Sequence, residues 1–562
     1  MNYTPQISPL GPLWLSAIVG LLPLVTIFIT LGWLRWKAHW AGLTALAVAI
    51  GVAVFAWQMP AVLAVLAATQ GAVFGMFPIM WIVFTAIVLY QITVVSGRFE
   101  DLRGVFALVS DDPRVQAMLI AFCFGGLLEA LAGFGAPVAI TGVMLMAIGF
   151  SALRAAIVVL VANTAPVAFG AIAIPIITAG NLTKIPYQEI GAYVGHQTPL
   201  LAAFVPLILV LLADGKRGFK QLWPIALVTG LAFAVAQWVS ATWLSVELTD
   251  IIASLFGLAA AVGFLRFWKP EGAADALATL HADRDAELAS MTEKERSALP
   301  TLHADKGTAH LDGGRIFMAL FPYLLVIAVF SVTKLIDPVK NWMASTDIKI
   351  PWPGLDGHVL TAAGTPSAST IYNFQWFSSP GTSLLISMVI VAIVYRVSAG
   401  EVIGEIWATL VKLRYSILTV ASVLALAYVM NLSGQTITIG TWIAGTGAAF
   451  AFFSPVLGWI GTAVTGSDTS ANALFSTLQQ TAGLQAGIDP TLLVAANTSG
   501  GVVGKMISPQ NLTIAATAVG LLGRESDILR RVIWWSIGML IALCLLVGLQ
   551  STPVLSWMLP VF

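Results

Sequence analysis

The stretch VTGSDTSANALF, residues 464–475, places the carboxylate of Asp468 among Thr and Ser hydroxyls inside a long apolar region, 437–484. A helix that crosses a bilayer needs about 20 mainly apolar residues and keeps its backbone groups hydrogen-bonded. A glycine and an acid at such a depth predict that the chain turns back here. We therefore expect a re-entrant hairpin whose turn is buried in protein or lines a cavity.

A second apolar region, 115–150, is interrupted in the same way by GFGAP at 133–137. Gly133 and Gly135 permit a tight reversal, and Pro137 fits the first turn of a helix, where its missing N–H costs nothing. The returning helix would present free N–H groups and the positive end of its dipole to the protein interior. Two hairpins, each with a turn suited to binding an anion, are therefore predicted.

The composition indicates a membrane protein throughout. Hydrophobic residues make up 58% of the 562 residues, charged residues 10%, and the mean hydropathy is +0.90. We predict an all-α polytopic membrane protein with about twelve transmembrane helices plus the two hairpins. The predicted crossings are 10–34, 40–57, 61–95, 155–180, 186–213, 221–241, 251–268, 316–336, 381–395, 415–433, 491–520 and 532–558.

The distribution of Lys and Arg predicts the orientation, because these residues accumulate on the cytoplasmic side of a membrane. With both termini outside, most of the 27 basic residues face the cytoplasm. The exceptions are Lys184, Lys334, Lys340, Lys349 and Lys505. The first 30 residues carry no basic residue and no small-residue cleavage site, so no cleaved signal peptide is expected. A net charge of zero gives no indication of nucleic-acid binding.

An internal repeat links the two halves of the chain. Residues 161–175, VANTAPVAFGAIAIP, and 495–509, AANTSGGVVGKMISP, share Asn-Thr, a Gly and a Pro at equal spacing, and each follows a hairpin break. The two hairpins would enter from opposite sides, as in transporters built from inverted repeats. The predicted units are an N-terminal half, 1–268, with a broken helix at 155–180; a cytoplasmic linker, 269–315; and a C-terminal half, 316–562, with a broken helix at 491–520.

The sequence resembles the L-lactate permease family of bacterial carboxylate transporters over nearly its whole length. The similar stretches are GGLLEALAGFGAPVAI (125–140), ANTAPVAFGAIAIPI (162–176), TGSDTSANALF (465–475), AANTSGGVVGKMISPQN (495–511) and AVGLLGRESDILRRV (518–532). The resemblance implies proton-coupled uptake of lactate, and usually glycolate, across the bacterial cytoplasmic (inner) membrane. In YVGHQTPL (193–200), His196 stands where the family is expected to have arginine, which would hold a carboxylate at any pH.

Four ionisable residues lie within predicted membrane segments, where a charge costs several kcal/mol and a function is the default hypothesis. Glu129, Asp468 and His196 are the candidate proton-coupling residues. Asp468 is equally suited to cap a helix, and His196 to pack as a satisfied side chain. Lys505 is predicted to pair with Glu129 or Asp468, or to bind the substrate carboxylate.

Polar and small residues around the breaks are the candidate substrate site. With Lys505, these are Gly133, Phe134, Gly135, Asn163, Thr164, Ser467, Asn497 and Thr498. A secondary polar lining is predicted from Thr469, Ser470, Asn472, Ser508 and Gln510. Each of these polar residues could instead only hold the broken helices together.

The expected function is import of L-lactate and related small 2-hydroxy monocarboxylates, glycolate and D-lactate among them, by proton symport. A co-transported proton cancels the charge of an anion that would otherwise oppose the potential at about 2.3 kcal/mol per 100 mV. A sodium-coupled carboxylate or dicarboxylate carrier, and a passive channel or sensor, are the open alternatives. No enzyme is expected, since the sequence has no P-loop, metal motif or nucleophile–base pair. The predicted partners are the substrate and the bilayer, with the proton as coupling ion, no metal and no other cofactor.

Overall fold

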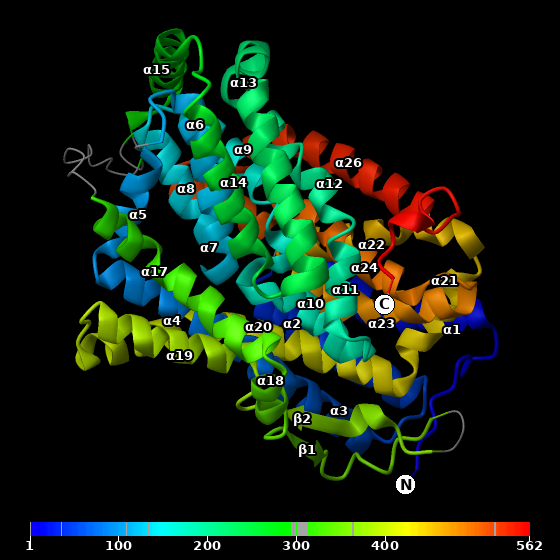
Figure 1. Ribbon diagram of the computed structural model, residues 1–562. Helices are drawn as coiled ribbons and strands as arrows, with labels where there is room; N and C mark the ends of the chain where they lie inside the picture. The colour runs from blue at the N-terminus through cyan, green and yellow to red at the C-terminus, as the bar shows by residue number, and fades with distance from the viewer. Residues whose placement is uncertain are drawn as a thin grey trace.

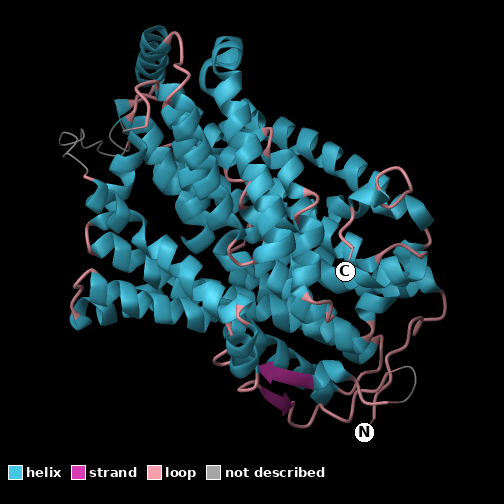
Figure 2. Cartoon of the chain, in the orientation of Figure 1, coloured by secondary structure: helices cyan, strands magenta, loops and turns pink. Residues whose placement is uncertain are grey.

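A computed structural model describes residues 2–34, 36–107, 109–132, 135–293, 296, 299, 312–361, 365–521 and 524–561. Almost all of the regular structure is helical (Figures 1 and 2), as predicted. The first half contains α1 (Leu13–Phe28), α2 (Ala38–Phe55), α3 (Ala61–Phe74), α4 (Trp81–Val95), α5 (Arg98–Ala107), α6 (Pro113–Met118), α7 (Gly125–Ala132), α8 (Ala136–Ala147), α9 (Ala152–Ala162), α10 (Gly170–Thr183), α11 (Tyr187–Val194), α12 (Thr198–Ala202), α13 (Val205–Val239), α14 (Thr249–Leu265) and α15 (Ala273–Ser290).

The second half begins after the linker and contains the only two strands among the described residues. Its elements are α17 (Gly313–Phe330), α18 (Asp337–Ala344), β1 (Ile348–Pro351), β2 (Ile371–Phe374), α19 (Pro380–Val394), α20 (Ala399–Ser433), α21 (Gln435–Ala444), α22 (Phe450–Thr465), α23 (Asp468–Ala486), α24 (Pro490–Gly504), α25 (Pro509–Ala518) and α26 (Glu525–Gln550).

Among the described residues, nine helical segments are long and apolar enough to cross a membrane, or ten if one bent pair is counted. A multi-span membrane protein is therefore confirmed, while the count of twelve crossings stays a prediction. Two predicted crossings, 186–213 and 221–241, belong to one helical run, Tyr187–Leu244. They are separate helices within it, because Asp214 and Gly215 leave helical geometry inside α13.

Packed helix pairs lie at both predicted hairpins, α7 with α8 and α22 with α23. That these pairs re-enter instead of crossing stays a prediction, since the first arms, Pro113–Leu131 and Gly447–Thr465, are among the nine described segments long enough to cross. Glycines in the left-handed region turn the chain at each tip, Gly135 (φ 86°) and Gly466 (φ 77°). A Cβ at Gly135 would overlap Ile514, and one at Gly466 would crowd Gln510. Since these two residues are one turn apart on α25, both tips meet the same helix.

The helix that returns from each hairpin packs against the broken helix of the other half. Helix α8 contacts α25, and α23 contacts α10. The helix predicted to be broken within 155–180 is broken: Ala152–Ala162 is followed by Val167–Thr183 at an angle of 64°. This reciprocal exchange is the arrangement that an inverted repeat would produce.

The second break does not lie where the repeat placed it. Asn497 and Thr498 are in the middle of the continuous helix α24, which ends only at Gly504. A 3₁₀ turn, Lys505–Ile507, and an extended Ser508 then separate α24 from α25. The match with the first half, where Asn163 ends α9, would place a break at Asn497, and this expectation is wrong. Pro166 lies in the break before α10, whereas no proline follows Asn-Thr within α24.

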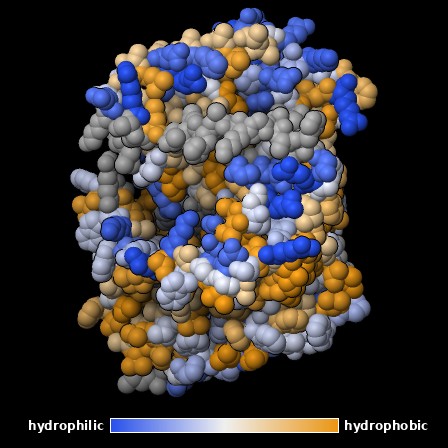
Figure 3. All heavy atoms as spheres, turned by 90° about the vertical axis from the view of Figure 1, so that its left-hand side faces the viewer, coloured by the Kyte–Doolittle hydropathy of each residue, from blue (hydrophilic) through white to orange (hydrophobic). Residues whose placement is uncertain are grey.

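Burial separates the interior from the periphery. Pro113–Leu131 forms the first arm of the first hairpin, and 94% of its 18-residue apolar stretch is buried. The corresponding share for Gly313–Thr333 is 28%. Protein therefore encloses Pro113–Leu131, whereas Gly313–Thr333 exposes an apolar surface suited to lipid. On the face shown in Figure 3, hydrophilic residues gather toward the end that carries α15, and hydrophobic residues are more common over the lower half.

The two long polar connections lie at opposite ends of the molecule, α15 at one and the β1–β2 hairpin at the other (Figure 1). The segment 337–380 contains α18 and an antiparallel pair of strands with Ile348 opposite Phe374. β-branched and aromatic side chains in both strands explain the pairing. Within the linker, Glu287 of α15 accepts hydrogen bonds from the first backbone N–H groups of α9.

Candidate functional site

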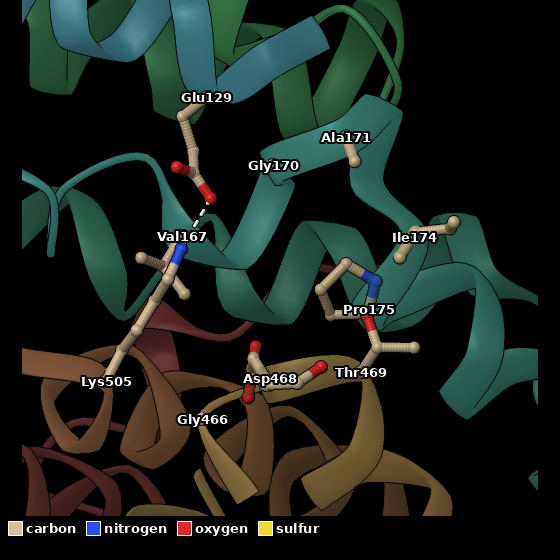
Figure 4. A pocket seen from close by; sticks show the side chains of 11 residues that line it. Glu129, Val167, Gly170, Ala171, Ile174, Pro175, Gly466, Asp468, Thr469 and Lys505 are labelled. Carbon is tan, nitrogen blue, oxygen red and sulfur yellow. Dashed lines mark hydrogen bonds and ion pairs between the residues drawn. The ribbon is translucent and has the colours of Figure 1, made fainter. Parts of the chain in front are cut away.

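A cavity of about 40 Å³ lies between the α9–α10 break and the tip of the second hairpin. This volume suffices for about three water molecules, so only a small ligand fits without movement of the walls. The lining residues are Glu129, Val167, Gly170, Ala171, Ile174, Pro175, Gly466, Ser467, Asp468, Thr469 and Lys505 (Figure 4).

A buried ion pair crosses this cavity and joins the two halves of the chain. Lys505 Nζ lies 2.6 Å from Glu129 Oε1, and Asn163 Nδ2 donates to Glu129 Oε2 at 2.9 Å. Glu129 is 3% exposed and Lys505 7%. Figure 4 shows Lys505 reaching from the 3₁₀ turn after α24 toward Glu129 on α7. Of the predicted partners of Lys505, the structure selects Glu129.

The backbone beside Glu129 requires a glycine at position 170 and is strained over the next three residues. A Cβ at Gly170 would come within 3.0 Å of Glu129 Cγ and Oε1. Ala171, Ile172 and Ala173 then have φ of 45°, 57° and 57°. This left-handed conformation costs about 1–2 kcal/mol for each residue with a Cβ. Such strain persists only where the surroundings hold it, and it is common at binding sites.

Asp468 faces the same cavity from the second hairpin but has different partners. Ser467 rather than Asp468 caps α23, since its hydroxyl accepts from Ser470 N at 3.3 Å. Asp468 Oδ1 accepts from Thr462 Oγ1 at a long 3.4 Å, and Oδ2 has no hydrogen-bond partner among the residues that the structure describes. The side chain is 4% exposed and lies within electrostatic reach of Lys505. Lys505 is therefore paired with Glu129 and lies near Asp468, a second buried carboxylate.

Several predicted binding residues hold the helices together instead of lining the cavity. Asn472 Nδ2 donates to Thr498 Oγ1 at 2.9 Å and to Pro175 O at 3.0 Å, and Asn497 Nδ2 donates to Asn472 Oδ1 at 2.8 Å. These bonds tie α23 to α24 and to α10. Thr164 donates to a carbonyl of its own helix end, Val161 O. The alternative that such residues are structural is the one that the geometry favours.

The other predicted residues at the second break and the second hairpin tip also fall into two groups, those that line the cavity and those that do not. Ser467 and Thr469 line the cavity. Ser470 contributes its N–H to the cap, and Ser508 caps α25 by accepting from Asn511 N. Gln510 is exposed beside the Gly466 tip. Of these five residues, only Ser467 and Thr469 therefore line the cavity.

His196 lies away from the cavity, between α11 and α12. Its Nδ1 is 2.7 Å from Ala192 O, and its Nε2 accepts from Trp238 Nε1 at 2.9 Å. Both ring nitrogens are thus engaged, as the packing alternative requires. At the first hairpin tip, Gly135 faces Ile514 and does not line the cavity, while Gly133 and Phe134 lie outside the described residues.

Sequence reasoning missed two parts of the site. Gly170 and Pro175 belonged to the repeat but were not predicted to line the cavity, although an equal spacing of Gly and Pro in both halves was the signal. Asp250 was placed just outside the crossing 251–268, yet it is completely buried on α14. Within the described part of the chain, no group of three or more His, Cys, Asp or Glu side chains is placed to hold a metal ion.

The sequence pattern of the L-lactate permease family matches residues 16–554. The chain belongs to this family. The L-lactate permease of Bacillus subtilis is 42% identical over the whole of both chains. The glycolate permease GlcA of Escherichia coli is 41% identical over 94% of each chain, and the L-lactate permease of the same organism is 39% identical over 98% of each. The resemblance seen in the sequence and the expected transporter class are thereby confirmed.

Likeness to solved structures is weak. The MtrF protein of Neisseria gonorrhoeae, described as one of a class of antimetabolite efflux pumps, matches 74% of this chain and 83% of its own at 14% identity, with a TM-score of 0.29. The YdaH transporter of Alcanivorax borkumensis matches 82% of this chain and 88% of its own at 14% identity, with a TM-score of 0.28.

Proposed function

We propose that this member of the L-lactate permease family imports L-lactate and glycolate, with D-lactate as a further substrate, by proton symport across the bacterial cytoplasmic membrane. The observation that carries the proposal is the buried Lys505–Glu129 pair at the wall of a cavity that also receives Asp468. A substrate carboxylate is the natural competitor of Glu129 for this lysine. The small volume of the cavity favours a short monocarboxylate.

The charges around the cavity supply the coupling. Two carboxylates and one lysine would leave a net negative charge in a buried site, which costs several kcal/mol, so one of the acids holds a proton. Asp468, with the poorer set of hydrogen bonds, is the acid assigned that proton. When a substrate carboxylate takes the place of Glu129 at Lys505, Glu129 becomes unpaired and binds a second proton.

One anion therefore brings one proton, and the loaded site stays neutral. Asn163 keeps Glu129 within reach of Lys505 when the substrate leaves. The hydroxyl of a 2-hydroxy acid would meet Ser467 or Thr469, which border Asp468. We assign His196 no part in this step, because it does not border the cavity.

For the architecture we propose twelve crossings with both termini outside and two hairpins that enter from opposite sides. The exchange of contacts between the halves, α8 with α25 and α23 with α10, supports the inverted units 1–268 and 316–562. The separation of α15 and the β1–β2 hairpin at opposite ends supports a cytoplasmic linker at 269–315 (Figure 1).

The test is uptake by purified protein in liposomes, with proton and sodium gradients imposed separately and lactate, glycolate, pyruvate and succinate compared. We expect lactate and glycolate to accumulate when the outside is made acidic, with no response to sodium, and succinate to be excluded by size and charge. Accumulation that follows sodium and ignores the pH step would overturn proton symport. Equilibration without accumulation would indicate a channel.

A further inference from the structure

A third buried acid lies behind Glu129. Asp250 is in the first turn of α14, which packs against α7, and its side chain is completely buried. Neither of its carboxyl oxygens has a hydrogen-bond partner in the described part of the chain. Burying a carboxylate in this condition is among the most costly arrangements in a protein, so its charge state needs an explanation.

The neighbours of Asp250 that the structure describes offer acceptors. Gln237 of α13 lies near the carboxyl group, although no hydrogen bond joins the two, and its Nε2 donates to Ala165 O at 3.0 Å. Its Oε1 is buried without a donor among the described residues. A proton on Asp250 removes the charge of the unpartnered carboxylate and supplies a donor in a region where the described acceptors lack one.

Asp250 also belongs to the surroundings of Glu129. Ser254 is one turn further along α14, and its hydroxyl lies against the Cα of Gly126, one turn before Glu129 on α7. Gln237 is bonded to Ala165 in the same break that supplies Asn163 to Glu129. Asp250, the break and Glu129 thus form one buried polar cluster.

No described cation is free to neutralise Asp250. On the elements packed against α14, the facing titratable groups are Glu129 on α7 and Cys123 in the π-helical segment before it. Lys505 is within electrostatic reach but is already paired with Glu129. Glu247, on the segment that leads into α14, accepts from Tyr187 and Ser245.

We propose that Asp250 is a third proton-binding site, beside Asp468 and Glu129, which holds a proton while Glu129 is paired with Lys505 and gives that proton to Glu129 when substrate displaces it. The O–H bond of Asp250 breaks as an O–H bond forms on Glu129, and Asp250 is then reprotonated from the outer side, so that one proton enters with each anion and the cluster stays neutral. In the proposed topology Asp250 is at the outer end of α14, on the side from which the proton is imported. This inference rests on the proposed proton symport.

The experiment compares Asp250→Asn with Asp250→Glu in liposomes, and uses Asp285→Asn, an exposed acid on α15, as the matched control. We expect Asp250→Asn to keep lactate counterflow, which needs no net proton transfer. Its uptake driven by a pH step should fall by about 100-fold. Asp250→Glu, which retains the acid, should recover most of the loss, and the control should behave as the unaltered protein. Full pH-driven uptake by Asp250→Asn would overturn the proposal.

An infrared measurement needs no substrate and therefore separates this inference from the proposed function. The unaltered protein at neutral pH should show a protonated-carboxyl band that Asp250→Asn lacks. If that variant does not fold, Gln237→Leu keeps the acid and removes its acceptor, and the band should shift. A band that neither variant changes, or one abolished by sodium at constant pH, would contradict a proton on Asp250. Failure of all pH-driven uptake with the band intact would contradict proton symport alone.

Discussion

Glu129 and Asp468 are buried carboxylates that face one cavity from the two hairpins of the chain. Glu129 is held on both oxygens, by Lys505 and Asn163, whereas Asp468 has one long hydrogen bond and an Oδ2 with no partner in the described residues. In a buried site, the better-paired acid is the one that can remain charged. The comparison teaches that the two hairpins supply differently paired acids to the same cavity: Glu129 of the first hairpin is bonded to Lys505 and Asn163, whereas Asp468 of the second has one long hydrogen bond.

The largest effect is expected from Lys505→Met, which removes the cation that both acids share. Loss of one partner of a buried pair costs about 3–5 kcal/mol, so uptake should fall by about 100-fold or more. Lactate uptake in liposomes measures this, and Lys216→Met, at the exposed turn within α13, is the control. Uptake near that of the control would mean that Lys505 is not part of the site.

A large effect is also expected from Gly501→Ala, which acts on Asp468 and on Thr462, its hydrogen-bond donor. The added Cβ would overlap Asp468 Oδ1 and come within 2.6 Å of Thr462 Oγ1. Crowding of this kind costs about 1–3 kcal/mol, and uptake should fall by roughly tenfold or more. Gly538→Ala has open space around its Cβ and serves as the matched helical glycine. Equal uptake by the two variants would mean that the position of Asp468 does not matter.

Asp468→Asn keeps the shape of the side chain and removes its proton. Uptake should fall by about tenfold and lose its increase at acidic external pH, since a general acid contributes at least this much. Initial rates at several external pH values measure the change. An unaltered pH profile would reduce Asp468 to a residue that only packs in the first turn of α23.

The smallest effect is expected from Asn163→Ala, which leaves Glu129 on Lys505 but removes its second hydrogen bond. Loss of a hydrogen bond to a charged group costs about 1.5–3 kcal/mol, part of which water can recover here, so a fall of about tenfold or less is expected. Thr164→Val, which removes only a bond within the helix end, is the control. A larger loss than for Lys505→Met would reverse the order of importance proposed for the two groups.

The broad architecture was predictable because hydropathy and the glycine breaks act locally. The helix pairs at 115–150 and 437–484 and the bend at 155–180 could be inferred from them, whereas the family was inferred from the resemblance of longer stretches of sequence. For the ion pair, the sequence left two candidate partners of Lys505, Glu129 and Asp468. Which acid contacts the lysine depends on how distant parts of the chain pack together. Asn163 and Asn497 match in sequence, yet one ends a helix and binds Glu129 while the other lies inside a helix and binds Asn472. Equal residues in the two repeats therefore have different roles, because the residues after them in the chain differ.

Asp250 shows a second limit of the sequence. It stands at the first residues of an apolar run, where a carboxylate ordinarily reaches water, and only the packing of α13 and α7 around α14 buries it. The left-handed conformation of Ala171 to Ala173 could not be predicted from the sequence either, because Ala and Ile rarely adopt it. Both features depend on contacts between distant segments.

The most direct test of the account is Glu129→Gln, measured in the same liposomes for lactate counterflow and for accumulation driven by a pH step. Glutamine cannot take the proton that Glu129 is proposed to bind when substrate occupies Lys505. We predict that counterflow persists and that pH-driven accumulation is lost. Accumulation at the level of the unaltered protein would contradict the claim that the substrate carboxylate and Glu129 exchange places on Lys505.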